Sequence, residues 1–455
     1  MTKNRRGFFC QQCGYETAKW AGRCPSCQEW NTLVEELVVP ASRTNRREKG
    51  ASRPVALDDI DGSVLSRYLT GSSEMDRVLG GGLVPGSLVL LGGDPGIGKS
   101  TMMLQVAHHL SRTYGTVLYV SGEESIFQIK MRSERLGLSS EKLLILGESN
   151  LEAVEAQIKM LKPLLVVIDS IQTSYRPEIP MSPGSLGQVR ESTAFLAQAA
   201  RDHHTAIWLV GHVTKEGSLA GPRMLEHMVD VVLYFEGDKQ YSFRLLRGSK
   251  NRFGSTNETG MFDMTEQGMI DIANPSEWLL LERPNSAVGS VVIPVMEGSR
   301  PVLIEVQALV ASAGFGQPRR SVTGADYNRV SLILAVLEKK VGLMIGSHDV
   351  FVNIVGGVRT SEPAADLGIA AALVSSFRNV AVADKLVMLG EIGLTGEVRS
   401  VNQIGPRLRE ASRLGYTNSV IPRGNLKNLE SSHQDKTTGV VRLEEALEAV
   451  LGGCF

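Results

Sequence analysis

One segment of the chain has the residue types and spacing needed to bind a nucleoside triphosphate. Residues 93–100, GDPGIGKS, fit the pattern G-x-x-x-x-G-K-[ST]. The glycines let the backbone turn tightly, so that successive N–H groups face phosphate oxygens. We expect Lys99 to place its charge on the outer phosphates and Ser100 to ligate magnesium. The predicted nucleotide site comprises Gly93, Asp94, Pro95, Gly96, Ile97, Gly98, Lys99, Ser100 and Thr101.

A strand and a helix must flank this segment for it to hold phosphates. The apolar run 88–91 predicts a buried parallel strand, because it offers no polar residue to either face. Beyond the segment, apolar residues recur at helical spacing from Met102 to Leu110. The positive end of such a helix attracts anions. A chance glycine-rich turn would not come with both flanks, so we predict a nucleotide site.

Acidic residues follow two further predicted strands. Apolar runs typical of buried parallel strands occupy residues 117–120, 164–168 and 207–210. The first is followed by SGEE, which contains Glu123, and the second by Asp169. A lone acid after a strand is usually structural. Several polar strand ends at the carboxyl edge of one sheet favour a ligand site, and Asp169 suits magnesium coordination there.

Two basic residues stand close together after another predicted strand. The alternating run 241–245 leads into KNRFG, which contains Lys250 and Arg252. We expect both cations to be exposed on a hairpin-like turn. From there they could reach the γ-phosphate of a neighbouring subunit and neutralise charge in the transition state.

Two long loops have a composition that suits single-stranded nucleic acid. They run from 172 to 190 and from 214 to 223, and loops of this length in a compact domain are usually functional or disordered. Cations contact the nucleic-acid backbone and aromatic rings stack on bases. Composition alone gives binding of single-stranded nucleic acid by these loops no better than an even chance. The candidate DNA contacts are Tyr175, Arg176, Lys215 and Arg223.

Four cysteines near the N-terminus have the spacing of a metal site. Cys10 and Cys13 form one C-x-x-C pair, and Cys24 and Cys27 form a second. Two such pairs present four thiolates tetrahedrally to zinc, which would supply the folding energy of so short a segment. Two disulfides or a redox pair are the alternatives, and the cytosol favours zinc over both. The sequence leaves open whether this zinc finger contacts DNA, another protein or the neighbouring domain. Cys454 has no partner in the sequence and is expected to be incidental.

Composition limits the classes of protein to which the chain can belong. Its 455 residues suit two or three domains, and a net charge of −1 gives no global attraction to nucleic acid. No apolar stretch suits a signal peptide or a membrane span. We therefore expect a cytoplasmic protein without a membrane partner. The predicted divisions are a zinc finger at 1–39, a basic linker at 40–54, an ATPase domain at 55–271 and a separate α/β domain at 272–455.

The order of these features resembles the bacterial RadA (Sms) family of DNA repair proteins over essentially the full chain. The cysteine pairs, GDPGIGKST, SGEE, VVIDS and KNRFG carry the resemblance, and KNRFG is its signature. The central domain is similar to RecA and to the hexameric DnaB-type helicases. The resemblance implies an α/β protein with a RecA-like, mostly parallel sheet, an N-terminal zinc finger and a C-terminal domain like that of Lon protease.

The resemblance also implies roles for individual residues. Ser100 and Asp169 would hold magnesium, and Glu123 would polarise the attacking water. Lys250 and Arg252 would act across a subunit interface. The implied cofactors are ATP, Mg²⁺ and Zn²⁺. The implied partners are single-stranded and branched DNA, further copies in a hexamer, and the RecA recombinase.

The C-terminal domain departs from Lon protease at both catalytic positions. Where Lon carries its serine nucleophile, this chain has Ala364 in SEPAA, and at the lysine position it has Gly405. Neither residue can attack a carbonyl or accept a proton. We therefore expect a scaffold for the ring or a DNA-binding surface.

These inferences favour a ring-forming, DNA-stimulated ATPase that moves on single-stranded DNA and drives branch migration in recombinational repair. An ATP-driven switch or adaptor without motor activity is the alternative. An ATP-dependent protease is a weaker one, because the dyad is missing.

Overall fold

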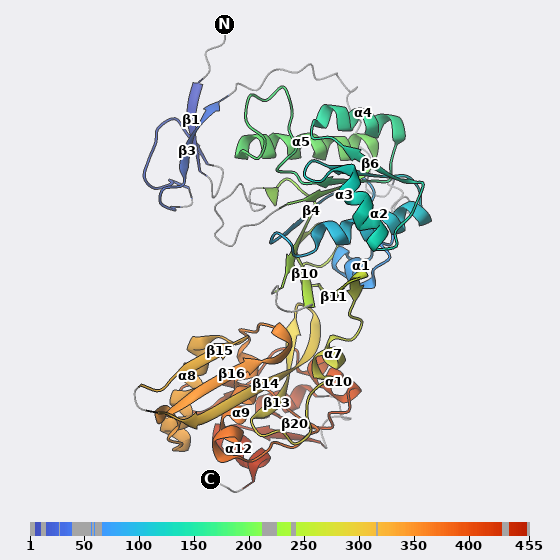
Figure 1. Cartoon of the computed structure of the whole chain (residues 1–455). Helices are drawn as coiled ribbons and strands as arrows, with labels where there is room; N and C mark the ends of the chain where they lie inside the picture. The colour runs from blue at the N-terminus through green and yellow to red at the C-terminus, as the bar shows by residue number, and fades with distance from the viewer. Residues whose placement is uncertain are drawn as a thin grey trace. The chain divides into compact units, whose positions relative to one another are not determined.

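The computed structural model describes residues 5–10, 15–26, 28–38, 56, 59, 66–211, 225–237, 243–314, 317–429 and 436–452. The chain divides into two compact units, Met1–Asp271 and Ile272–Phe455, which the colour bar of Figure 1 allows the reader to follow. None of the helices in the described ranges has the length and apolar character needed to span a bilayer.

A small antiparallel sheet forms the start of the first unit. Its strands are β1 (Arg5–Cys10), β2 (Glu16–Thr17) and β3 (Leu33–Val38), in the order β2-β1-β3. Among the residues of this segment that the structure describes, the buried cluster comprises Cys10, Cys24 and Leu33, with Phe8 and Ala21 packed against it. So small a core cannot stabilise a domain alone, which agrees with a segment that needs a metal to fold.

The central sheet of the first unit has nine strands within the described residues, in the order β12-β11-β10-β9-β4-β8-β7-β5-β6. Neighbours from β9 to β6 pair in parallel, and β10 to β12 extend the sheet as antiparallel strands. The parallel strands are β4 (Leu88–Gly93), β5 (Val117–Ser121), β6 (Leu143–Gly147), β7 (Leu165–Asp169), β8 (Ala206–Val210) and β9 (Val231–Glu236). The antiparallel strands are β10 (Phe243–Asn251), β11 (Thr259–Thr265) and β12 (Gly268–Asp271).

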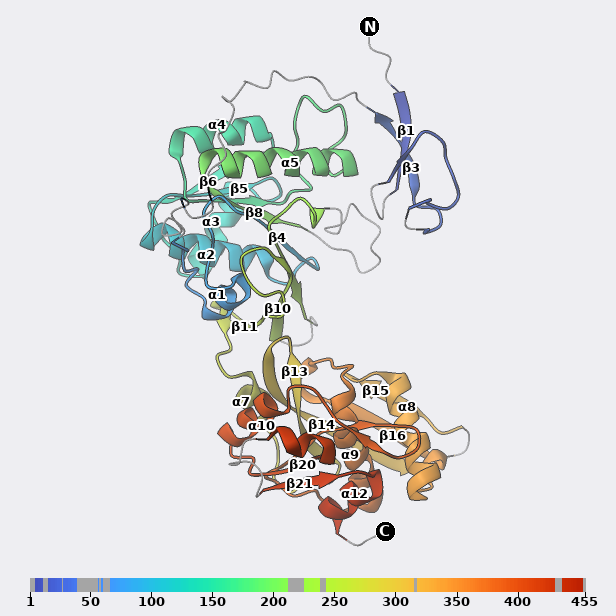
Figure 2. The same ribbon diagram turned by 180° about the vertical axis from the view of Figure 1, so that it is seen from behind.

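Helices cover both faces of this sheet. In β4, Val89 and Leu91 face one apolar core, and Leu88 and Leu90 face the other, which explains the uninterrupted apolar run. Helices α2 and α3 lie on one side and α4 and α5 on the other, as Figure 2 shows. The helices of this unit are α1 (Ser73–Leu79), α2 (Lys99–Thr113), α3 (Ile126–Arg135), α4 (Leu151–Leu161) and α5 (Leu186–His203).

The second unit is a separate α/β domain. Its described strands form a seven-stranded mixed sheet in the order β15-β16-β14-β13-β17-β20-β21, and β18 and β19 form a separate hairpin. The strands are β13 (Ser290–Glu297), β14 (Arg300–Ser312), β15 (Arg320–Thr323), β16 (His348–Ile354), β17 (Leu386–Met388), β18 (Glu391–Ile392), β19 (Val398–Arg399), β20 (Asn418–Pro422) and β21 (Thr437–Val440). The helices are α7 (Pro275–Leu280), α8 (Tyr327–Val336), α9 (Asp366–Arg378), α10 (Ile404–Arg413) and α12 (Leu443–Leu451).

Candidate nucleotide site

The glycine-rich loop connects the central strand β4 to the start of α2. Gly98 is the N-cap of α2 with φ +115°, a conformation that disfavours other residues, and a Cβ there would lie 2.4 Å from Met269 Cε. No side chain caps the first N–H groups of α2. These groups and the helix dipole are therefore directed at an anion. A hollow of about 230 Å³ opens beside the loop against the end of β9.

Lys99 is held inside this loop. Its side chain is 4% exposed, and Nζ donates hydrogen bonds to the carbonyl oxygens of Gly93 at 2.7 Å and Asp94 at 3.0 Å. Burial lowers the pKa of Lys99 to about 8, and the carboxylates of Asp169, Glu123 and Asp94 oppose that shift. A buried ammonium is costly without a negative partner, so the loop fits a phosphate group.

Two carboxylates reach the same edge of the sheet. Asp169 ends β7 and is 7% exposed, and its Oδ2 accepts a hydrogen bond of 2.5 Å from the phenol of Tyr119. Glu123 follows β5, and its Oε1 accepts a hydrogen bond from the hydroxyl of Ser170. Both acids act electrostatically on Lys99. The structure therefore brings together the three charged groups that the sequence predicts here, with oxygen donors of the kind that magnesium prefers.

The structure distinguishes two consecutive glutamates that the sequence cannot. Glu124 pairs with Arg132 on α3, which neutralises its charge. Glu123 instead contacts Ser170 beside Asp169. Glu123 is therefore the glutamate suited to accept a proton from water at this edge.

Lys250 and Arg252 lie at one end of the strands β4 and β9, and the phosphate-binding loop of the same subunit lies at the other end. Lys250 is opposite Val232 of β9, and the backbone N–H of Arg252 donates to Asp230, just before β9. The loop end of β4, by contrast, is level with Phe235 of β9. Five residues at ~3.3 Å rise separate Asp230 from Phe235, or about 16 Å along the strand. An arginine side chain cannot span that distance.

The sequence prediction that both cations are exposed on a turn is wrong for Lys250. Lys250 belongs to β10, and Nζ donates to the carbonyl oxygens of Glu226 at 2.6 Å and Val229 at 2.8 Å. Burial and the neighbouring Arg252 lower its pKa. The Arg252 side chain is 60% exposed, with Nη1 3.6 Å from Asp230 Oδ1. Arg252 is thus the more accessible of the two cations.

The turn that presents Arg252 is fixed by contacts that the sequence did not predict. Asn251 donates from Nδ2 to the carbonyl oxygen of Val78 at 3.1 Å and accepts from the Phe253 backbone N–H at 2.8 Å. Arg67 donates to the carbonyl oxygen of Phe253 at 2.8 Å. These contacts tie the turn to α1 and the segment before it, so the backbone at Arg252 is held in place.

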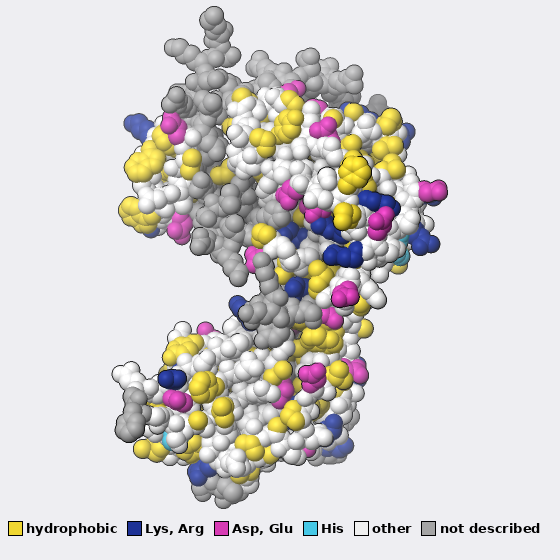
Figure 3. Space-filling model, in the orientation of Figure 1, with side chains coloured by type: hydrophobic (Ala, Val, Ile, Leu, Met, Phe, Trp, Pro, Cys, Tyr) yellow, Lys and Arg dark blue, Asp and Glu magenta, His cyan; other side chains and the backbone are white. Residues whose placement is uncertain are grey.

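The predicted DNA contacts find little support at the residues that the structure describes. Arg176 lies 2.9 Å from Glu152 and 3.1 Å from Glu178 and stacks over Phe195. Its charge is therefore paired within the unit, and a contact between Arg176 and DNA stays a prediction. The backbone of Tyr175 forms hydrogen bonds with the backbone of Ser149 and Leu151. Lys215 and Arg223 lie outside the described residues. On the face shown in Figure 3, basic and acidic side chains of this unit are interspersed.

The N-terminal sheet positions two of the four predicted zinc ligands. Cys10 and Cys24 are both buried, and their backbone N–H groups donate to the carbonyl oxygens of Tyr15 and Glu29, each at 2.9 Å. Cys13 and Cys27 lie outside the described residues. Two buried cysteines, one from each C-x-x-C pair, fit a four-thiolate zinc site.

In the second unit, an ion pair between a buried arginine and a partly exposed glutamate joins the two segments that resemble the Lon active site. Ala364 is buried just before α9, and Gly405 lies in the first turn of α10. Arg407, 1% exposed, pairs with Glu362 and donates to the carbonyl oxygen of Pro294 at 2.7 Å. The contact between these two segments is therefore a structural one, and neither Ala364 nor Gly405 can act as a nucleophile or base.

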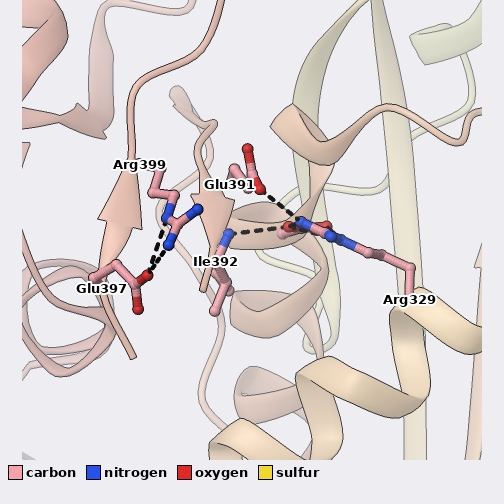
Figure 4. Close-up of polar contacts among 6 residues, drawn as sticks. Arg329, Glu391, Ile392, Glu397 and Arg399 are labelled. Atoms are coloured by element: carbon pink, nitrogen blue, oxygen red, sulfur yellow. Dashed lines mark hydrogen bonds and ion pairs between the residues drawn. The ribbon is translucent and has the colours of Figure 1, made fainter. Parts of the chain in front are cut away.

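A pocket of about 380 Å³ lies between α8 and the β18–β19 hairpin of the same unit. Arg329 pairs with Asp366 and lies 3.6 Å from Glu391, and Arg399 lies 2.6 Å from Glu397. Figure 4 shows Arg329 directed toward Glu391 and Arg399 directed toward Glu397. Hydrogen bonds from Thr395 lower the pKa of Glu397 to about 2. Apolar side chains supply much of the remaining lining: Leu332, Ile333, Val336, Ile392 and Leu394.

Three family models match separate parts of the chain. The family model of an AAA domain matches residues 52–218, that of a rubredoxin metal-binding domain matches residues 8–35, and that of subunit ChlI of Mg-chelatase matches residues 309–425. Among solved structures, a KaiC-like protein from Pyrococcus horikoshii covers 46% of this chain and 99% of its own, at 20% identity and a TM-score of 0.39. With its loop between β4 and α2 in a mostly parallel sheet, the protein is a RecA-like ATPase that carries a zinc ribbon and a Lon-like domain.

Full-length relatives identify the family. The chain is 50% identical to DNA repair protein RadA of Halalkalibacterium halodurans, over 99% of this chain and 100% of the relative. It is 49% identical to DNA repair protein RadA of Bacillus subtilis over the whole of both chains. The same protein of Listeria monocytogenes is 50% identical over 99% of each. The chain belongs to the RadA family of DNA repair proteins.

Proposed function

We propose that this protein is a ring-forming motor that hydrolyses ATP, moves on single-stranded DNA and promotes branch migration of recombination intermediates. One observation carries the proposal. Arg252 and the phosphate loop of the same subunit lie at opposite ends of β4, about 16 Å apart along the strand. A site completed by Arg252 therefore needs a second copy of the chain, and head-to-tail contacts of this kind form a ring when the rotation between copies closes.

The residues divide the work of phosphoryl transfer between two subunits. Lys99 and the N–H groups at the start of α2 hold the phosphates, and Ser100 and Asp169 would hold Mg²⁺. Bound there, the metal would supply positive charge that offsets the charge of the phosphate oxygens. Glu123 orients the attacking water and takes its proton.

The neighbouring subunit supplies the remaining positive charge. Arg252 neutralises the charge that develops on the γ-phosphate. Lys250 binds two carbonyl oxygens and so supports the strand from which Arg252 projects. This division gives Arg252 the finger role and gives Lys250 a supporting one.

We propose a homo-hexamer that acts on single-stranded and branched DNA together with the RecA recombinase in the cytoplasm. The names of the full-length relatives support the repair role. Zinc bound by Cys10, Cys13, Cys24 and Cys27 would order the N-terminal ribbon. The Lon-like domain would serve as a scaffold or a DNA-binding surface.

An ATP-driven switch without motor activity is the second candidate. The pairing of Arg176 with two carboxylates favours it, because that loop then offers DNA less charge than its composition predicts.

ATP turnover with and without single-stranded DNA, together with imaging of the assembly, separates the two candidates. A motor should show DNA-stimulated hydrolysis and closed rings in the presence of an ATP analogue and DNA. Hydrolysis indifferent to DNA, by a protein that stays monomeric under those conditions, would refute the motor.

A further inference from the structure

A buried tyrosine lies directly beneath the predicted magnesium site. Tyr119 is on β5, 1% exposed, among the apolar side chains between the sheet and α2. Its hydroxyl donates a hydrogen bond of 2.5 Å to Asp169 Oδ2. Val167, which is opposite Tyr119 in the parallel pair β5–β7, precedes Asp169 by two residues on the same strand. The phenol therefore reaches Asp169 from the same face of the sheet.

This hydrogen bond leaves the two oxygens of Asp169 in different environments. Oδ2 is engaged by the phenol, so Oδ1 is the oxygen better placed to receive a metal ion or its water.

We propose that Tyr119 is a positioning residue for magnesium, whose hydroxyl fixes the Asp169 carboxylate so that Oδ1 faces the metal. The proposal rests on the role of Asp169 in the proposed function. Groups that hydrogen-bond to metal ligands in this way set the orientation of the ligand, and their loss typically lowers metal affinity about 10- to 100-fold.

Tyr119→Phe removes the hydroxyl and keeps the shape of the core. The full chain is titrated with MgCl₂ in the presence of a fluorescent ADP analogue, and its affinity for the same analogue is measured without metal. We expect the half-saturating Mg²⁺ concentration to rise about tenfold or more, with metal-free affinity unchanged. Tyr114→Phe is the matched control, because it removes a phenol that accepts a hydrogen bond of 3.2 Å from the Leu69 backbone.

Two results would overturn the proposal. One is an unchanged Mg²⁺ requirement in Tyr119→Phe. The other is a loss of metal-free affinity as large as the loss with metal, which would assign Tyr119 a structural role. The variant Asp169→Asn tests whether Asp169 itself holds magnesium, independently of the role proposed for Tyr119. If that variant also keeps the wild-type Mg²⁺ requirement, the assignment of Asp169 itself fails.

Discussion

Rings mixed from Arg252→Ala and Lys99→Ala subunits should recover ATP hydrolysis that neither variant shows alone. Removal of an arginine finger lowers kcat by about 10³- to 10⁵-fold, and Lys99→Ala removes the charge that holds the phosphates. In rings formed at random from equal amounts, about one quarter of the interfaces join an intact Lys99 to an intact Arg252. We therefore expect about one quarter of wild-type activity if the sites act independently.

The structure indicates that Arg252→Ala will fold. The Arg252 side chain is 60% exposed and 3.6 Å from Asp230, and loss of such a surface pair costs at most about 1 kcal/mol. The backbone turn is held instead by Asn251 and Arg67, which the substitution leaves in place. Nucleotide binding by Arg252→Ala should thus stay close to wild type.

The assay uses two affinity tags, one on each variant, so that only mixed rings survive sequential purification. Steady-state ATP hydrolysis is then compared with that of each variant purified alone. Zero recovery in rings shown to contain both subunits would refute action between subunits. If Arg252→Ala kept full ATP hydrolysis but lost strand displacement, the turn would instead couple hydrolysis to movement on DNA.

Four further predictions follow from individual contacts. Cys24→Ser should release the one zinc ion per chain, as measured by elemental analysis, and should retain metal-free ADP binding. Elemental analysis that finds no zinc in reduced wild-type protein would contradict the four-cysteine zinc site. Arg407→Ala removes a fully buried guanidinium with its ion pair to Glu362 and its hydrogen bond to the Pro294 carbonyl oxygen, and should destabilise the second unit by about 2–3 kcal/mol in denaturant titrations, whereas Arg399→Ala, at an exposed side chain, should cost under about 1 kcal/mol; equal losses would refute a stabilising role for the Arg407 pair. Burial lowers the pKa of Lys99 to about 8, below its ordinary 10.5, so the site loses its positive charge as pH rises through that value. Metal-free ADP affinity should then fall up to about fivefold between pH 8 and 9, a decline that Lys99→Met should abolish. DNA affinity should drop steeply with salt, because a chain of net charge −1 must rely on local cations, and a flat dependence in a salt titration would point to a protein partner.

The fold class was predictable because its signals are local in the sequence. The run Leu88 to Leu91 is apolar on both faces because two cores cover β4, and this burial is what the sequence pattern reports. The loop that follows needs glycine at Gly98, where φ is +115°, so its chemistry is also visible in the sequence. Periodicity and turn chemistry of this kind need no knowledge of distant residues.

The contacts that decide the site are not local, and the sequence did not reveal them. Tyr119 meets Asp169 across 50 residues, and Arg176 meets Glu152 across 24. No periodic pattern indicates which acid a given arginine or tyrosine will contact. The position of Lys250 was missed for a related reason, because its burial depends on carbonyl oxygens of Glu226 and Val229.

Branch migration of a three-stranded DNA intermediate is the most direct measurement of the central claim, which is that ATP hydrolysis shared between subunits drives movement on DNA. The wild-type chain should extend the heteroduplex with ATP and Mg²⁺, and both Lys99→Ala and Arg252→Ala should fail while still binding the DNA. Extension by Arg252→Ala at the wild-type rate would contradict the account. So would a wild-type chain that hydrolyses ATP on this substrate without moving the branch.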